Sequence, residues 1–257
     1  MLPSIDIFGY SIPSYSTIGL LGLAIAAALA LLRAKKYGLT ANDVITAAAF
    51  AGLGLVIGGM ALNVLVRLPE VLANWDAFVA HWPQSIAFFG GMVFYGGLFG
   101  ALAALWVYCK VLQQNPASVF ALAVPVLPLA HGIMRLGCFA VGCCHGVPHD
   151  TLGIAFTHAI SAPNGVPLLP VQLYEAAFNF LLFAVLWIYS AKPRAPLNLL
   201  ALYGMSYAIG RFALESLRGD IHRGFILGLS TSQFISILVA STCVAALLIR
   251  HFRQKNK

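Results

Sequence analysis

Two arginines stand inside apolar segments of the chain, where a charged side chain is costly. Arg135 lies in "GIMRLGCFAVG" and Arg211 in "YAIGRFALESLRGD". An ionisable residue at membrane depth usually marks a substrate path or a binding site, because hydrocarbon does not solvate its charge. A guanidinium group suits a phosphate well, since it offers two parallel hydrogen bonds and a charge that does not titrate away. The two arginines therefore predict a site for an anionic phospholipid headgroup.

A cluster of thiols follows Arg135, in the run "GCFAVGCCHG". Taken alone, Cys138 is typical of a small buried residue. Cys143 and Cys144 come just before His145, and this histidine could lower the pKa of a nucleophilic thiol or accept its proton. A disulfide from Cys138 to either of the other two cysteines is easier to form than one between adjacent cysteines. The residues leave packing, a disulfide and a covalent nucleophile open.

The histidines near these thiols allow further interpretations. Together with the adjacent cysteines, His145 and His149 could bind a metal, but their spacing matches no common zinc pattern, and we expect no metal site. His131 lies one helical turn before Arg135, which makes it a second candidate base or, alternatively, a hydrogen-bonded core histidine. The chain has no phosphate-binding loop and no dinucleotide motif, so we expect no cofactor.

The composition indicates that lipid is the solvent for most of the chain. Of its 257 residues, 60% are hydrophobic and 9% are charged, and the mean hydropathy is +0.88. Soluble domains carry about 25% charged residues, so this chain lacks the polar surface to coat a soluble globule. The net charge of +7 does not indicate nucleic acid as a partner, because the basic residues form no stripe with interleaved aromatic residues.

Seven apolar runs are long enough to cross a bilayer, which takes about 20 residues of helix. These runs are Ser16–Leu32, Val44–Val66, Ser85–Val107, Ser118–Val141, Val171–Tyr189, Leu197–Leu217 and Thr231–Ile249. They must be helices, because each backbone has to satisfy its own hydrogen bonds in hydrocarbon. The sequence thus predicts an all-α integral membrane protein with seven transmembrane helices. Residues 1–257 form one polytopic membrane domain, with a small outer head region at about residues 142–170.

The basic residues predict the orientation of this domain. Ten of the fifteen Lys and Arg residues lie at helix ends that alternate to one side. They are Arg33, Lys35, Lys36, Lys110, Lys192, Arg194, Arg250, Arg253, Lys255 and Lys257. The positive-inside rule then places the C-terminus in the cytoplasm and the N-terminus outside. The other five basic residues are all arginines, and none of them belongs to a predicted cytoplasmic loop.

The remaining polar groups fall into one layer on the outer side. Counting 1.5 Å per residue along each helix places Arg135 and Arg211 in the outer half of the bilayer. Glu215 and Arg218 follow Arg211 at i+4 and i+7, which predicts one helical face for all three. The same count places the start of the fifth span and the thiol cluster near the outer surface; the residues concerned are Gln172, Tyr174, Glu175, Cys143, Cys144 and His145.

The chain resembles the prolipoprotein diacylglyceryl transferase family over nearly its whole length. The segments that carry the resemblance occur in the family's order: "FYGGLFG" (94–100), "GIMRLGCFAVG" (132–142), "PVQLYEA" (170–176), "YAIGRFALESLRGD" (207–220) and "TSQFISI" (231–237). The seven spans with the N-terminus outside are also similar to that family. The resemblance implies a transferase of the bacterial inner membrane with its active site on the outer side. It would move the diacylglyceryl group of phosphatidylglycerol to the cysteine thiol of a prolipoprotein.

The resemblance also implies roles for individual residues. Arg135 and Arg211 would contact the phosphate, and Glu215 and Arg218 complete the same motif. Gln172, Tyr174 and Glu175 would order the entrance of the site. Tyr95, which is followed by Gly96 and Gly97, stands where the family has a histidine, and it keeps a hydrogen-bonding group there but is a poor base. The site prediction contains all of these residues together with Cys143, Cys144, His145 and His131.

Two further departures from the family concern the acceptor side. The family pattern G-N-F-x-N-x-E reads "GCFAVGCCHG" here, and the outer segment before the fifth span is short. The donor-binding arginines are kept, so the departures predict a change in the acceptor before a change in the donor. One alternative is therefore the same donor with a glycan, a lipid or a small thiol as acceptor. Another is a thiol-redox or metal-handling membrane protein on the same scaffold, and a third is a lipid-binding protein without catalysis.

Overall fold

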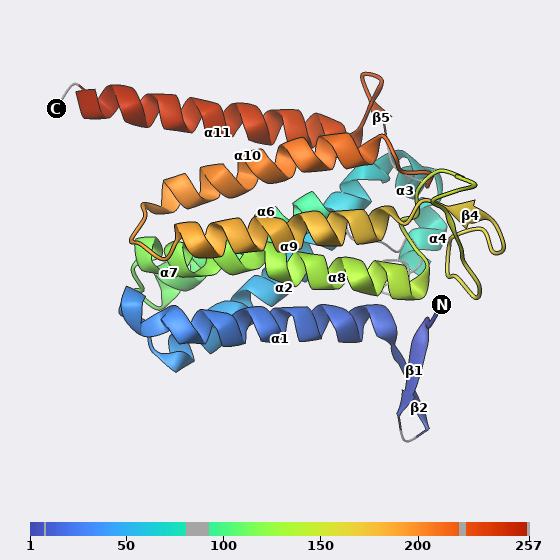
Figure 1. Ribbon diagram of the computed structural model, residues 1–257, viewed down its shortest axis with the longest axis horizontal. Helices are drawn as coiled ribbons and strands as arrows, with labels where there is room; N and C mark the ends of the chain where they lie inside the picture. The colour runs from blue at the N-terminus through green and yellow to red at the C-terminus, as the bar shows by residue number, and fades with distance from the viewer. Residues whose placement is uncertain (8, 81–92, 221–224, 256–257) are drawn as a thin grey trace.

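The computed structural model describes residues 1–7, 9–80, 93–220 and 225–255 and shows an elongated bundle of long helices (Figure 1). The long helices are α1 (Ser14–Ala34), α2 (Ala41–Val66), α6 (Phe94–Val111), α8 (Leu127–Val141), α9 (Val171–Tyr189), α10 (Pro196–Glu215) and α11 (Thr231–Lys255). Shorter helices are η1 (Lys35–Tyr37), α3 (Leu68–Ala73), α4 (Trp75–Ala80), α7 (Pro116–Ala123) and η2 (Val124–Val126). The predicted all-α membrane fold is confirmed at this level.

Six helical segments in the described part of the chain are long and apolar enough to cross a membrane. They are Ser14–Tyr37, Ala41–Val66, Phe94–Val111, Pro116–Val141, Val171–Tyr189 and Thr231–Lys255. The predicted span at Leu197–Leu217 is a helix of 20 residues, α10, but it is not among the six. The start of the predicted span at Ser85–Val107 lies outside the described residues, and the described helix there begins at Phe94.

The fourth span consists of three consecutive helical pieces. Helix α7 leads through η2 into α8, and Pro125 and Pro128 lie at the joints. A proline has no backbone N–H to donate and is best accommodated in the first turn of a helix, so it favours such joints. Helix α8 ends at Val141, because Gly142 adopts a left-handed φ of 70°, which is a common way to terminate a helix. This turn directs the chain into the thiol cluster.

Close contact between α2 and α6 depends on glycines. A Cβ atom at Gly54 or Gly58 on α2, or at Gly96 or Gly100 on α6, would overlap the backbone of the opposite helix. Small residues let the backbones of membrane helices approach closely, which strengthens their packing. Gly97 also faces α2, where a Cβ would lie 3.2 Å from the carbonyl oxygen of Leu55.

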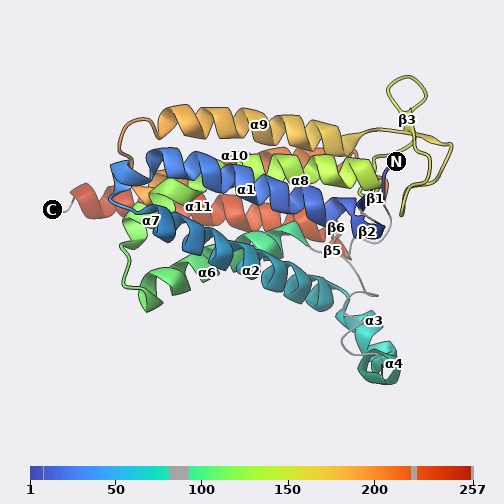
Figure 2. The ribbon, with the colours of Figure 1, turned by 90° about the horizontal axis from the view of Figure 1, so that it is seen from below.

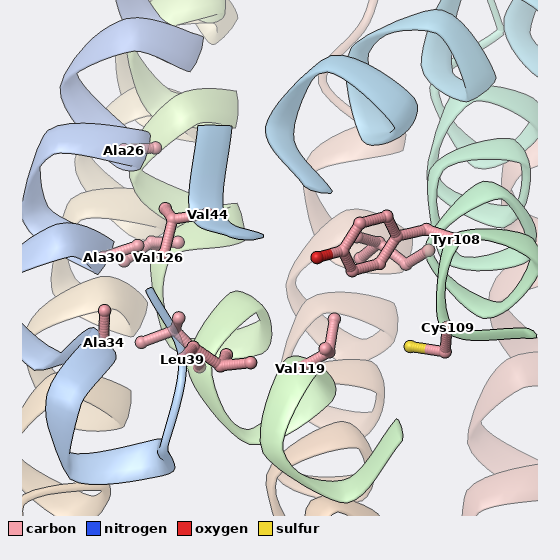
Figure 3. Packing of buried hydrophobic residues seen from close by; sticks show 11 residues of the cluster. Ala26, Ala30, Ala34, Leu39, Val44, Tyr108, Cys109, Val119 and Val126 are labelled. Carbon is pink, nitrogen blue, oxygen red and sulfur yellow. The ribbon is translucent and has the colours of Figure 1, made fainter. Parts of the chain in front are cut away.

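An apolar core joins the ends of α1, α2, α6 and α7 at one end of the bundle (Figure 3). It includes Ala26, Ala30, Ala34, Leu39, Val44, Tyr108, Cys109, Val119 and Val126. The hydroxyl of Tyr108 donates to the backbone oxygen of Asp43 at 3.1 Å. Nearby, Arg33 donates to the Ser190 hydroxyl at 2.8 Å and so ties α1 to the end of α9. Basic residues predicted to be cytoplasmic, including Arg33, Lys36 and Arg194, gather at this end.

The opposite end of the bundle carries the N-terminus and three short antiparallel hairpins (Figures 1 and 2). The strands are β1 (Ser4–Ile7), β2 (Tyr10–Pro13), β3 (Ile154–Ala155), β4 (Pro167–Leu168), β5 (Phe225–Ile226) and β6 (Leu229–Ser230). Register pairs Ser4 with Pro13 in the first hairpin and Ile154 with Leu168 in the second. The segment predicted as a head region thus contains the hairpin β3–β4, and the C-terminal end of α11 lies at the far end of the molecule.

Candidate active site

A buried carboxylate on α9 joins three helices. Glu175 is 1% exposed, and each of its oxygens is 3.0 Å from an arginine, Oε1 from Nη2 of Arg135 on α8 and Oε2 from Nη1 of Arg211 on α10. The hydroxyl of Tyr207, also on α10, donates to Oε1 at 3.0 Å. A buried charge is tolerated only when it is paired and hydrogen-bonded. The carboxylate therefore fixes the two predicted phosphate-binding arginines relative to one another.

The second carboxylate of the cluster is Glu215, one helical turn after Arg211. Its Oε2 lies 2.5 Å from Nη2 of Arg211, and that same nitrogen donates to the Ser232 hydroxyl on α11 at 3.3 Å. Arg211 and Glu215 thus lie on one face of α10, as their i+4 spacing predicts. Two arginines and two glutamates thus form a buried cluster that is neutral overall, which limits its desolvation cost. We call Arg135, Glu175, Arg211 and Glu215 the ion cluster.

His131 lies between the ion cluster and an aromatic wall. Its Nε2 is 3.6 Å from Oε1 of Glu175. Its ring stacks on Phe94 with centroids 3.6 Å apart and an interplanar angle of 9°, and its centroid is 5.3 Å from that of Tyr207. The structure thus brings His131 to the site, and its role as a base stays a prediction.

Tyr95 and the two glycines after it face different neighbours. The Tyr95 hydroxyl lies 2.6 Å from the Ser236 hydroxyl on α11, and its ring packs edge-on against Tyr207. The side chain is therefore next to the ion cluster, but its hydroxyl is hydrogen-bonded to a serine. Gly96 and Gly97 lie in the α2–α6 contact, so helix packing is sufficient to account for them.

Three thiols meet where α8 ends. The sulfur atoms of Cys138, Cys143 and Cys144 all lie within 4.8 Å of one another, and the three cysteines are free thiols. Nη1 of Arg135 lies 3.7 Å from Sγ of Cys138. The three thiols therefore adjoin the ion cluster through Cys138. The backbone N–H of Cys143 donates to the Cys138 carbonyl at 3.0 Å, and Cys144 has a left-handed φ of 59°; together they fold this turn back on α8.

His145, Gln172 and Tyr174 lie outside the group of three sulfurs. Nδ1 of His145 lies 2.9 Å from the carbonyl oxygen of Gly146. Nε2 of Gln172 donates to the Cys143 carbonyl at 2.7 Å. Tyr174 is partly exposed on α9. Among these three predicted site residues, Gln172 has a defined contact with the thiol turn.

The i+7 spacing predicts Arg218 on the same face of α10 as Arg211, but the structure places it outside this helix. The helix ends at Glu215, and Arg218 instead follows in a turn that pairs with Gly146 as a β-bridge. Its guanidinium group donates to both carboxylate oxygens of Asp220, at 2.9 and 2.5 Å. The i+7 prediction is wrong because a helical face extends no further than the helix. Asp220 and the serines on α11 were missed, since no spacing within one helix connects them to the arginines.

An apolar cavity of about 610 Å³ leads to His131. It lies between α1, α2, α6 and α8, and its wall includes Gly19, Leu23, Val56, Leu98 and Met134. A pocket with an apolar wall and a few polar groups at one end is typical of small-molecule binding sites. This arrangement suits a ligand with a hydrocarbon part and a charged head.

Comparison with known proteins shows the relationship along nearly the whole chain. The family model described as "Prolipoprotein diacylglyceryl transferase" matches residues 4–249. A relative named phosphatidylglycerol–prolipoprotein diacylglyceryl transferase in Clostridium tetani is 34% identical over 97% of this chain and 98% of its own length. A second, in Clostridium perfringens, is 33% identical over 91% of this chain and 89% of its own. A third, in Streptococcus equi subsp. zooepidemicus, is 29% identical over 94% and 92%, respectively. The chain therefore belongs to the prolipoprotein diacylglyceryl transferase family.

Proposed function

We propose that this membrane protein transfers the diacylglyceryl group of phosphatidylglycerol to the cysteine thiol of a prolipoprotein. In this reaction the carbon–oxygen bond to the phosphate breaks, a carbon–sulfur bond forms, glycerol phosphate leaves and the thiol proton is released. Family membership supports the reaction class, and the names of the full-length relatives support both substrates. The lipid donor is supported by the two-arginine site, whose Glu175 lies 3.6 Å from His131 in the wall of the apolar cavity.

The observation that carries the proposal is the convergence of Arg135 and Arg211 on Glu175. Nε of Arg135 is buried and has no hydrogen-bond acceptor among the described residues. A buried donor without an acceptor is costly, so this position suits the oxygen of a bound phosphate. Preorganised arginines that meet a leaving phosphate stabilise the charge that develops on it, which is the main electrostatic task of this reaction.

The apolar cavity beside His131 is suited to the acyl chains of the donor. Chains in the cavity between α1, α2 and α6 would place the headgroup at the polar end of α8. Tyr174, Gln172 and Arg218 would then lie on the side from which the acceptor peptide arrives. Tyr95 would position the site through Ser236 and Tyr207.

We further propose that α10 crosses the membrane as well, which gives seven crossings of the inner membrane. The N-terminus and the ion cluster would face the outer side and the C-terminus the cytoplasm, in accord with the positive-inside rule. Residues 1–257 would form one membrane domain, with residues 142–170 as its reduced outer region. A reporter enzyme fused after Lys257 should be active only in the cytoplasm, and one inserted near His149 only outside. The reverse pattern would overturn this orientation.

Complementation tests the function directly. We expect expression of this protein to restore lipoprotein modification in a strain that lacks its own prolipoprotein diacylglyceryl transferase, as read from the gel shift and mass of a lipoprotein. Failure to modify the lipoprotein, together with normal binding of phosphatidylglycerol, would favour the alternative acceptor suggested by Tyr95 and the altered thiol segment.

Transfer by the purified protein from donors of different chain length tests the cavity with a matched pair of variants. A side chain at Gly19 would project into open space, because its Cβ meets no atom within 4 Å. Gly19→Phe should therefore fill part of the cavity and lower kcat/KM for long-chain donors at least about 10-fold, the scale of a poor fit in an apolar pocket. Gly19→Ala gives the control, since it changes the helix backbone similarly but leaves the cavity open.

A further inference from the structure

We propose that Cys138, Cys143 and Cys144 bind one zinc ion, with a fourth position left open for the thiolate of the acceptor cysteine. The metal site follows from the three thiols alone. The role of its open position rests on the proposed function. From the sequence we expected no metal here, because the ligand set considered was the adjacent cysteines with His145 and His149, and its spacing matches no common zinc pattern. The structure instead brings together three sulfur atoms, one from the last turns of α8 and two from the residues that follow this helix.

The positions of the three sulfur atoms are close to those of a zinc site. Zinc–sulfur bonds of about 2.3 Å in a tetrahedron place the sulfur atoms roughly 3.8 Å apart. The three sulfurs already lie within 4.8 Å of one another, so each needs to move roughly half an ångström toward the centre. Cys138 is held by α8, and Gln172 holds the backbone at Cys143. The turn therefore presents the ligands before a metal arrives.

The ligand type and the neighbouring charges favour zinc. Thiolates are soft ligands that select zinc over calcium or magnesium, and three protein ligands with one open position are characteristic of catalytic zinc sites. Three thiolates around Zn²⁺ leave one net negative charge. Arg135 lies 3.7 Å from Cys138, and Arg218 pairs by a β-bridge with Gly146, two residues after Cys144. These two arginines would offset that charge.

The open position accounts for how the acceptor thiol is activated without the family's histidine. When the lipoprotein cysteine binds to zinc, its proton is released to water, because a metal-bound thiol is deprotonated. The thiolate sulfur then attacks the glyceryl carbon of the donor. The carbon–oxygen bond breaks with its electron pair on glycerol phosphate, whose charge meets Arg135 and Arg211. The product thioether is a weaker zinc ligand than a thiolate and leaves the metal.

Metal content provides a test that does not depend on transfer. We expect the full-length protein, purified in detergent with a reductant that does not bind metals, to contain about one zinc ion per chain by elemental mass spectrometry. Cys138→Ser, Cys143→Ser and Cys144→Ser should each lower the zinc content to roughly a tenth, because loss of one of three ligands removes the site. Cys243→Ser is the matched control, since this cysteine lies on α11 outside the cluster, and it should keep its zinc.

Cobalt gives a second readout of the same ligands. Replacement of zinc by Co²⁺ should produce sulfur-to-cobalt charge-transfer absorption that changes when a cysteine-containing lipoprotein peptide is added, and the corresponding serine peptide should cause no change. Protein that transfers the diacylglyceryl group but contains no zinc would overturn the metal site and leave the proposed function standing. A disulfide among the three cysteines in active protein would also overturn it. Zinc bound by these thiols in protein that does not transfer would support the site and refute its role with the acceptor.

Discussion

The Arg135→Lys and Arg211→Lys variants should each transfer the diacylglyceryl group at least about 100-fold more slowly than the unaltered protein, a loss of about 2.7 kcal/mol. Lysine keeps the charge, but it loses the planar group that can donate to Glu175 and to a phosphate at the same time. The chemical step should therefore suffer more than donor binding, and kcat should fall more than KM rises. Single-turnover transfer to a lipoprotein peptide measures this step.

The matched control for both variants is Arg67→Lys. Arg67 pairs with Glu70 near the end of α2, and the Glu70 side chain in this pair is 55% exposed. Exposed ion pairs contribute about 0–1 kcal/mol, so this variant should keep nearly full activity. If the Arg135 and Arg211 variants kept near-normal turnover as well, the two arginines would be structural, and the phosphate would have to bind elsewhere.

The polar residues within one helix could be predicted from the sequence, because helical spacing is fixed. Arg211 and Glu215 are an example: four residues apart, they lie on the common face that their spacing predicts, and there they form an ion pair. Arg218 shows the limit of the same rule, since α10 ends at Glu215 and the next residues turn toward Gly146. A helix end depends on local capping and on tertiary contacts, and no glycine or proline marks this one at Ser216.

The meeting of residues from different helices could not be predicted in this way. Glu175 was expected at the entrance of the site, but it is the centre of the ion cluster. Which face of α9 turns inward depends on its packing against α8 and α10. The hydrophobic residues of α9 itself lie on all sides of the helix and form no clear periodic stripe that would mark the inward face. The thiol cluster could not be predicted from helical spacing either, because the left-handed turns at Gly142 and Cys144 bring residues 138, 143 and 144 together. The family resemblance named the arginines, but it gave no guide to cysteines that the family pattern lacks.

Loss of the Glu175 carboxylate should cause the largest change in stability. In Glu175→Ala, the charge of Arg135 stays buried without a carboxylate, whereas Arg211 keeps Glu215. Removal of one partner from a buried ion pair costs about 3–5 kcal/mol, so the free energy of unfolding should fall by that amount. Denaturant titration in detergent micelles, followed by tryptophan fluorescence, measures the change. Glu70→Ala removes an exposed carboxylate and should cost less than about 1 kcal/mol.

A compensating double variant separates stability from catalysis. In Glu175→Leu/Arg135→Met both members of one ion pair are apolar, and the pair of Arg211 with Glu215 remains. Apolar replacement of a whole buried pair is often neutral or stabilising, so the double variant should regain most of the free energy that Glu175→Ala loses. Transfer should nevertheless stay at least about 100-fold below normal, because one of the two phosphate contacts is gone. Recovery of transfer together with stability would show that Arg135 and Glu175 serve the fold alone, and Arg211 would then have to hold the phosphate without them.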